Sequence, residues 1–398
     1  MTAPEIHGQA ADAPTPRPVP VFWQMGFRPF YLMAGLFGAF SVLLWVAQHA
    51  GWIRHAYLAG AIWHAHEMLF GYTLAVMVGF LFTAGANWTG RPMPTGTLLK
   101  SLVLLWLAGR VLVLTPYGWA AAIICTAFPL AAAVALAIPF LAARNRRNYF
   151  FVALLCVMAA ATAAVHLSQL QVIALPAWLG IRIGLDVVLF IMAVMAGRVI
   201  PMFTNNGVPG AGAERLDPIE KMALGSLLAL LAADVMHLQG EPMAVAATVA
   251  CGMHFMRLWL WHPWKTVRAP LVWVLHLAYL WIPIHLGLRA AAEFGAAPAN
   301  IATHALTVGA IGMLTMGMMT RTARGHTGRP LIADGWETAC YLLVLAAALV
   351  RVAGPWVAPA HYVGSVWVSG LVWSAAFALF SIRYWPVFTR ARVDGRQG

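Results

Sequence analysis

Charged side chains are scarce in this sequence. They make up 10% of its 398 residues, whereas hydrophobic residues make up 62%; an average soluble domain carries about 25% charged residues. A soluble chain needs polar side chains to cover its folded surface, so this composition excludes a water-soluble globular protein. Long apolar runs recur from Met33 onward, and each approaches the roughly 20 residues that cross a bilayer as a helix. The sequence therefore predicts an all-α polytopic membrane protein embedded in a lipid bilayer.

Lysine and paired cysteines are scarce as well. Only three of the 25 basic residues are lysines, and no basic stretch is interleaved with aromatic residues to form a groove. We therefore expect the net charge of +12 to set membrane topology, with no nucleic acid as a partner. The cysteines form no CxxC pair and all fall inside apolar spans, so we interpret them as small core residues. They are Cys125, Cys156, Cys251 and Cys340.

Several sequence motifs of soluble enzymes are missing. The chain has no Walker loop, dinucleotide fingerprint, HExxH motif or nucleophile elbow, which argues against an ATPase or a serine hydrolase. Its N-terminus is rich in Pro and Ala and lacks the short apolar region and cleavage site of a signal peptide. We expect residues 1–25 to form a disordered cytoplasmic tail.

Apolar runs separated by helix breakers predict twelve transmembrane helices within residues 26–385, followed by a cytoplasmic tail at 386–398. Proline and glycine fall in the gaps between the runs. The predicted spans are 27–48, 64–84, 97–115, 118–142, 148–170, 175–199, 217–237, 242–262, 269–290, 300–322, 335–353 and 360–384. With the N-terminus inside, most Lys and Arg fall on the cytoplasmic side, and the outer loops hold only Arg54, Arg289 and Arg351. This alternation predicts that both termini are cytoplasmic.

The second and tenth spans share a sequence repeat. A histidine, two glycines and a Thr-Gly-Arg-Pro turn recur at the same spacing. One copy has His66, Gly71, Gly79 and Thr89-Gly90-Arg91-Pro92, and the other has His304, Gly309, Gly317 and Thr327-Gly328-Arg329-Pro330. An interval of eight helices fits three units of four helices, although the sixth span, which would be the middle copy, has no matching histidine. Repeats of this kind typically place a binding site where the copies face each other.

Histidines are numerous for a chain with so few polar residues, and ionisable groups in the membrane are candidate functional sites. For any single one, an interfacial or hydrogen-bonded role is the alternative. The orientation above places several of the 14 near the outer face: His49, His64, His66, His166, His237, His285, His304 and His361.

The densest group of polar residues is Trp63-His64-Ala65-His66-Glu67-Met68. Residues two apart on a helix point about 200° apart, so His64 and His66 are expected to face different sites. Glu67 shares the face of His64 and could orient its imidazole. Met68 could supply a thioether ligand suited to copper or haem. An interfacial belt of His and Trp is the alternative interpretation.

Three further groups are candidates. Arg110 and Arg182 lie in the outer halves of spans and could bind haem propionates. Arg182 also has Asp186 one turn later, which would make an internally neutralised pair. His276 and Tyr279 lie one turn apart and could hydrogen-bond or relay protons.

These segments resemble the NnrS family of bacterial membrane proteins, which are linked to nitric oxide and nitrosative stress. The matching residues are Gly26-Phe27-Arg28-Pro29-Phe30, residues 63–71, Asn87-Trp88-Thr89-Gly90-Arg91-Pro92, residues 106–110, 197–201 and 275–279, and the stretch from His304 to Pro330. The resemblance implies haem and copper as cofactors and the bacterial inner membrane as the location. The predicted arrangement of twelve spans also resembles the haem-copper oxidase subunit, whose second and tenth helices carry haem ligands. The absence of histidine from the sixth span and of a His-His pair from the seventh departs from that enzyme.

We therefore expect His66 and His304 to ligate a haem, of b-type, from opposite sides. His64 is the candidate for a second metal, with Glu67 or Met68 in support, and His276 is a weaker candidate for either site. The favoured function is a haem- and copper-binding protein of the nitric oxide response. Its enzymatic form would be an oxidoreductase that reduces nitric oxide with an unidentified electron donor, protons entering past Glu67 or Asp234. The alternatives are a transporter of metal, haem or a small solute that uses the same histidines, and an assembly or sensory partner.

Overall fold

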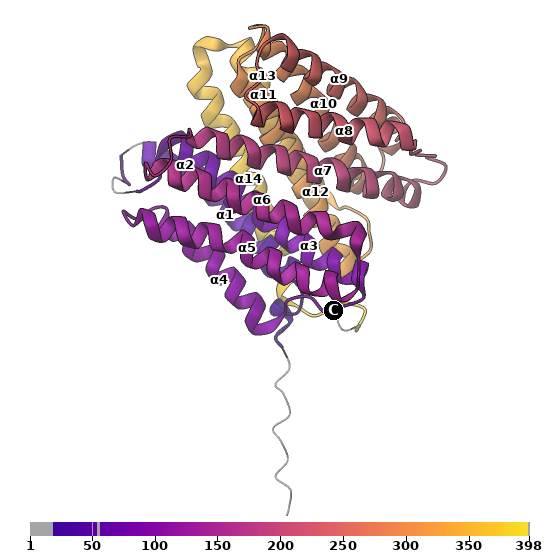
Figure 1. The fold of residues 1–398 in the computed structure, drawn as a ribbon. Coiled ribbons are helices and arrows are strands. Elements are labelled where there is room, and N and C mark those ends of the chain that lie inside the picture. The colour runs from indigo at the N-terminus through magenta and orange to yellow at the C-terminus, as the bar shows by residue number, and fades with distance from the viewer. Residues whose placement is uncertain (1–18, 50, 54–55, 397–398) are drawn as a thin grey trace, which may run out of the picture.

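The computed structural model describes residues 19–49, 51–53 and 56–396, and it contains helices but no strand within them. The tail expected at 1–25 falls mostly outside the described residues. Each predicted span corresponds to one continuous helix (Figure 1). The helices are α1 (Phe27–His49), α2 to α3 (Gly60–Thr89), α4 (Gly96–Leu112), α5 (Gly118–Ala142), α6 (Tyr149–Gln169), α7 (Ala177–Gly207), α8 (Asp217–Val235), α9 (Glu241–Trp259), α10 (Pro270–Glu293), α11 to α12 (Ala299–His326), α13 (Gly335–Val357) and α14 (Tyr362–Thr389).

Nine of the described helices are long and apolar enough to cross a bilayer by length and composition. The other three are α4, which has 17 residues, and α8 and α9, which carry charged side chains. All three pack against long apolar helices, α4 on α5 and both α8 and α9 within the group that contains α10. The all-α polytopic membrane fold expected from the sequence is thereby confirmed.

Neighbouring helices run antiparallel and pack in two groups. In Figure 1, α1 to α6 occupy the lower part of the molecule and α8, α9 and α10 the upper part, with α7 between them. Accordingly, α7 packs against α6 on one side and against α8 and α10 on the other. The helix ends therefore gather at two opposite ends of the bundle. We call one of these the His66 end. The helices α2, α5, α7 and α11 begin there, and α4, α6, α8, α10 and α13 end there.

The two helices of the sequence repeat share a backbone irregularity. Each changes from α- to π-helix directly after its histidine: the π-helix η2 (Glu67–Thr73) follows His66, and η5 (Ala305–Gly312) follows His304. π-helical turns are rare and frequently occur at functional sites. The repeat read from the sequence is therefore also present in the backbone.

The repeated glycines allow close packing beside both π-helices. A Cβ atom on Gly71 would collide with the Arg110 guanidinium, and one on Gly309 would collide with the Trp281 indole. The Trp106 indole N–H also donates to the Gly71 carbonyl oxygen, at 3.0 Å. Each glycine thus gives a neighbouring helix access to the backbone of the π-helix.

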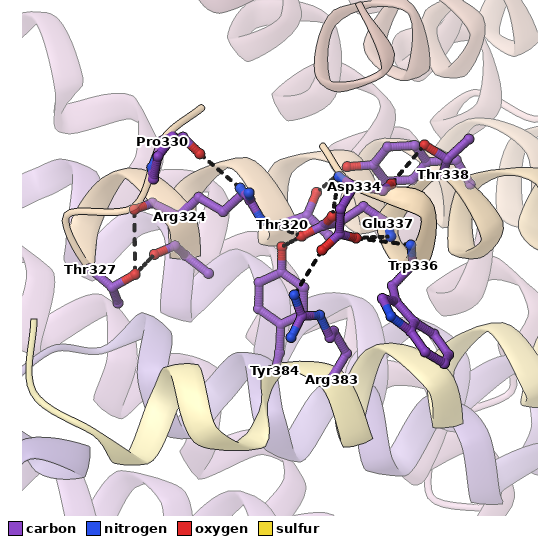
Figure 2. Close-up of polar contacts among 12 residues, drawn as sticks. Thr320, Arg324, Thr327, Pro330, Asp334, Trp336, Glu337, Thr338, Arg383 and Tyr384 are labelled. Carbon is purple, nitrogen blue, oxygen red and sulfur yellow. Dashed lines mark hydrogen bonds and ion pairs between the residues drawn. The ribbon is translucent and has the colours of Figure 1, made fainter. Parts of the chain in front are cut away.

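A polar network closes the bundle at the end opposite the His66 end (Figure 2). The buried Glu337 carboxylate accepts hydrogen bonds from Arg324 Nη1 at 2.6 Å, from the Tyr384 hydroxyl at 2.8 Å and from the Asp334 backbone N–H at 2.7 Å. Asp334 in turn caps the first turn of α13 and pairs with Arg383 at 2.7 Å. Arg324, Glu337, Asp334 and Arg383 are each paired in this network, which joins α12, α13 and α14.

Candidate metal centre

The alternating helix direction brings the polar residues of distant segments to the His66 end. His66 is the last residue of α2 and so lies near the start of the continuous helix Gly60–Thr89. Arg110 lies near the end of α4, and Cys125 lies in the second turn of α5. His166 lies in the last turn of α6. Because α2, α4, α5 and α6 enter or leave this end of the bundle, residues far apart in sequence reach the same depth.

A buried cluster forms where these helices meet. One ligand atom each from His66, Cys125 and His166 lies within 4.8 Å of the others, and all three residues are buried. The His66 and His166 rings are 4.8 Å apart between centroids. In each ring Nε2 is buried and lacks a hydrogen-bond partner among the described residues. Buried polar atoms are normally paired, so two free lone-pair donors beside a thiol indicate a metal site.

Glu67 and Arg110 support the cluster from one side. The Glu67 carboxylate accepts from His66 Nδ1 at 2.8 Å and pairs with Arg110 Nη1 at 2.9 Å. With Nδ1 donating to the carboxylate, Nε2 is the nitrogen left to bind an ion, as in carboxylate–histidine–metal arrangements. Arg110 Nη2 donates to the Cys125 sulfur at 3.4 Å. A neighbouring cation is the setting in which a cysteine acts as a metal ligand.

Tyr57 orients the second histidine. Its hydroxyl donates to the His166 carbonyl oxygen at 3.0 Å and lies 3.4 Å from His166 Nδ1, and the two rings are stacked with centroids 5.7 Å apart. Gly180 of α7 packs against the backbone beside Val165. The His166 ring is therefore held by Tyr57 of the loop before α2, and the helix that carries His166 packs against α7.

Two imidazole nitrogens and a thiol form a donor set for a soft or borderline metal ion, such as copper or zinc. The distance between the two rings leaves room for a single ion and not for a porphyrin between them. The cluster therefore fits a single soft or borderline metal ion, and a haem ligated by His66 and His304 from opposite sides stays a prediction.

The structure changes the roles expected for Glu67 and Met68. Glu67 binds His66, its neighbour in sequence, and not His64. The Met68 sulfur accepts from the Ser41 hydroxyl at 3.3 Å and is not part of the cluster. The regular-helix spacing used for Glu67 and Met68 does not apply to them, because the π-helix begins at Glu67.

His64 and His304, in contrast, lie near each other. The electrostatic interactions of His304 include both His64 and Arg351, and those of His64 include Arg351. His304 Nδ1 donates to the Asn300 carbonyl oxygen at 2.6 Å; His64 packs against Trp45 with centroids 5.0 Å apart. His64 and His66 face different sites, as expected, but His64 is the one that interacts electrostatically with His304.

The expected pair of Arg182 and Asp186 is replaced by a larger network. Arg182 is 3.4 Å from Asp234 Oδ1, whereas the ion pair of Asp186 is with Arg289, at 3.8 Å. Arg110 is 6% exposed and pairs with Glu67; its role toward a haem propionate stays a prediction.

His276 and Tyr279 do not bond to each other, although they lie one turn apart. His276 Nε2 bonds to the Thr204 hydroxyl at 2.7 Å. The Tyr279 hydroxyl bonds to His254 Nδ1 at 2.6 Å and accepts from Arg257 at 3.0 Å. Each partner comes from a neighbouring helix, which local spacing does not reveal.

Sequence reasoning missed Cys125, His166 and Tyr57 as members of the site. Cys125 was interpreted as a core residue, and His166 only as one of many outer histidines. A usable signal was the distance from the helix ends: His66, Cys125 and His166 all lie within two turns of the His66 end. Tyr57 belongs to a loop and carried no such signal.

The fold and the cluster together define a polytopic membrane protein with a candidate metal centre buried between its helices. The family model of the NnrS protein matches residues 21–392, nearly the whole chain. This protein belongs to the NnrS family. No curated protein sequence matches it.

Proposed function

We propose that this protein holds a copper ion between His66, His166 and Cys125 and acts in the nitric oxide response of a bacterial inner membrane. The observation that carries the proposal is the pair of buried, unpartnered Nε2 atoms beside a thiol, all within 4.8 Å. Family membership supplies the link to nitric oxide. The positive-inside pattern supports cytoplasmic termini and an outward-facing His66 end.

The surrounding residues prepare the donors for an ion. Copper bound there would supply a redox-active centre to which nitric oxide can bind. Glu67 holds the His66 tautomer, Arg110 balances the charge of Glu67 and of the sulfur, and Tyr57 orients His166. Because the cluster is buried, bulk water is excluded, and a small uncharged molecule such as nitric oxide can reach it through the apolar bundle.

Haem is the second cofactor that the family resemblance implies, and we propose a different pair of histidines for it. We assign it to His304 and His64, which come from the two repeat helices and lie in electrostatic range of each other. His64 Nδ1 is buried and unpartnered among the described residues, and His304 Nδ1 is occupied by Asn300, which leaves Nε2 as the ligand. Arg351, in range of both, would bind a propionate.

Metal analysis and optical spectra of the purified protein test both assignments. His66→Ala and His166→Ala should each remove most of the copper and leave the haem spectrum, whereas His64→Ala and His304→Ala should change the haem spectrum and leave copper. Exposed His361 provides the control variant His361→Ala. Unchanged copper in both His66→Ala and His166→Ala would rule out this centre. Zinc in place of copper would rule out redox chemistry there.

The transporter alternative predicts a different result. Such a protein should move a metal ion or haem across sealed vesicles and purify without a stoichiometric chromophore. Addition of nitric oxide to the reduced protein should shift the optical spectrum if the proposed function is correct. Solute flux together with no spectral response to nitric oxide would favour the transporter.

A further inference from the structure

A second polar cluster lies on the opposite side of α7 from the candidate metal centre. Gly184 of α7 packs against Leu69 and Phe70 beside His66. Asp186 contacts Arg289 of α10 and Asp234 of α8. The helix thus separates a metal centre from a group of acids and arginines at the same end of the bundle.

The acids in this cluster outnumber the cations that pair closely with them. Arg289 Nη2 donates to both oxygens of Asp234 at 2.6 Å, which is a short, charge-assisted contact. Its Nη1 reaches Asp186 Oδ1 only at 3.8 Å. The second cation, Arg182, is 53% exposed at its side chain and lies 3.4 Å from Asp234. One well-placed guanidinium therefore serves two buried carboxyl groups.

Asp186 has a buried oxygen without a donor. The residue is 8% exposed, and no N–H or O–H group of the described residues reaches its Oδ2 atom. Asp186 and Asp234 both contact the Arg289 guanidinium, which places the two carboxyl groups side by side. The remaining titratable group nearby, His285, donates its Nδ1 proton to the Ala302 carbonyl oxygen at 2.8 Å. His285 therefore does not supply the missing donor.

A carboxylate next to another carboxylate, in an apolar setting and without a donor, is costly. A proton placed between the two groups removes one charge and supplies the missing hydrogen bond, as in other paired carboxyl groups. We propose that Asp186 and Asp234 form a proton-binding site that holds one proton between them. Arg289 balances the single remaining charge. The partly exposed Arg182 lies beside the pair, where the proton exchanges with the aqueous phase.

Glu337, another buried carboxyl group in the same molecule, provides the contrast to Asp186. Glu337 accepts from Arg324, Tyr384 and a backbone N–H (Figure 2), so it has donors enough to remain a carboxylate. Asp186 has no comparable set. We therefore expect an infrared carbonyl band of a protonated carboxylic acid from Asp186 and Asp234 and none from Glu337.

The test is infrared spectroscopy of the full-length protein at neutral pH in H2O and in D2O. The wild type should show a carboxylic acid carbonyl band that shifts in D2O. Asp186→Asn should remove this band. Asp234→Asn should remove it as well, because Arg289 can then pair with Asp186 and hold it ionised. Arg289→Gln should increase the band, since both acids then lack their cation.

Control variants test whether the infrared band comes from the Asp186–Asp234 pair. Glu337→Gln should leave the band unchanged, and Glu67→Gln identifies any separate band from that carboxyl group. Circular dichroism and copper content are measured on each sample. Unchanged copper in Asp186→Asn separates this proposal from the metal centre. A folded Asp186→Asn protein that retains the full band would overturn the proton-binding pair, and so would a wild type without a D2O-sensitive acid band.

Discussion

His66 and Glu67 are neighbours in the chain, and their side chains are joined by a hydrogen bond of 2.8 Å between Nδ1 and Oε1. Consecutive residues on a regular α-helix point about 100° apart, which does not favour such a pair. The change from α- to π-helix falls between these two residues. The backbone irregularity and the support of the candidate ligand therefore occur at the same place.

The two cysteines on α5 and α6 should differ in their effect on copper. Cys125 is buried in the cluster, whereas Cys156 is exposed on the surface of α6. We expect Cys125→Ser to lower the copper content strongly, because a hydroxyl is a poor ligand for a soft metal ion. Cys156→Ser should retain the wild-type content in the same metal analysis. Equal copper in both variants would exclude the sulfur as a ligand.

Glu67→Gln should destabilise the protein and weaken metal binding. Removing the charge leaves the buried Arg110 guanidinium without its anion, and breaking a buried ion pair costs about 3–5 kcal/mol. Loss of a carboxylate that orients a ligand typically weakens metal affinity by about 10- to 100-fold. Thermal unfolding in detergent and metal titration measure the two effects. Adding Arg110→Gln should cost less than the sum of the single changes, because the pair is coupled.

The exposed Glu214 is the control for that experiment. Glu214→Gln should change stability by no more than about 0.5 kcal/mol. If Glu67→Gln behaved in the same way, Glu67 would not be a buried partner of Arg110.

The repeated glycine should not tolerate a methyl group. In Gly71→Ala the new Cβ would collide with Arg110 and Phe37, so we expect a loss of about 1–3 kcal/mol, the usual effect of overpacking. Because Arg110 must move, copper affinity should also fall. Gly225 of α8 has open space around it, and Gly225→Ala should stabilise by about 0.5–1 kcal/mol. Thermal unfolding of both variants measures these two changes in stability.

The cap of α13 should make stability depend on acid pH. Hydrogen bonds from the Arg383 guanidinium and from the backbone N–H groups of Trp336 and Glu337 hold the pKa of Asp334 well below its usual range. A lowered pKa in the folded state means that the stabilisation is complete above the unfolded value, near 4, and is lost as pH falls below it. Asp334→Ala should therefore unfold more easily at neutral pH, by about 1 kcal/mol for the cap. The difference from wild type should shrink in acid.

Hydropathy and helix breakers were sufficient to locate the helices. The predicted spans match the twelve continuous helices within a few residues at most ends, since a bilayer requires both an apolar run and a paired backbone. The largest difference is α7, which continues to Gly207 although the prediction ended it at residue 199. Thr204 in this extension is buried and bonds to His276.

The candidate site was only partly readable from the sequence. His66, Glu67 and Arg110 were identified, because ionisable residues inside apolar runs are conspicuous. The partner of Glu67 was not, because its carboxylate bonds to His66 and not to His64, and Cys125 and His166 were not recognised as neighbours of His66. The π-helix that redirects these side chains has no recognisable sequence signal, and the rule for regular helices fails there.

The sequence by itself determined the membrane class, the number and position of the helices, the repeat and the family. These depend on composition, periodicity and local motifs, which can be read from a single segment of the chain without knowing what it packs against. Only the tertiary structure decided that Cys125 and His166 join His66, that His64 lies beside His304, and that Asp186 meets Asp234. Such contacts depend on which helices pack together and on the rotation of each helix about its axis. Those quantities follow from the packing of the whole bundle, and a single apolar run carries little information about them.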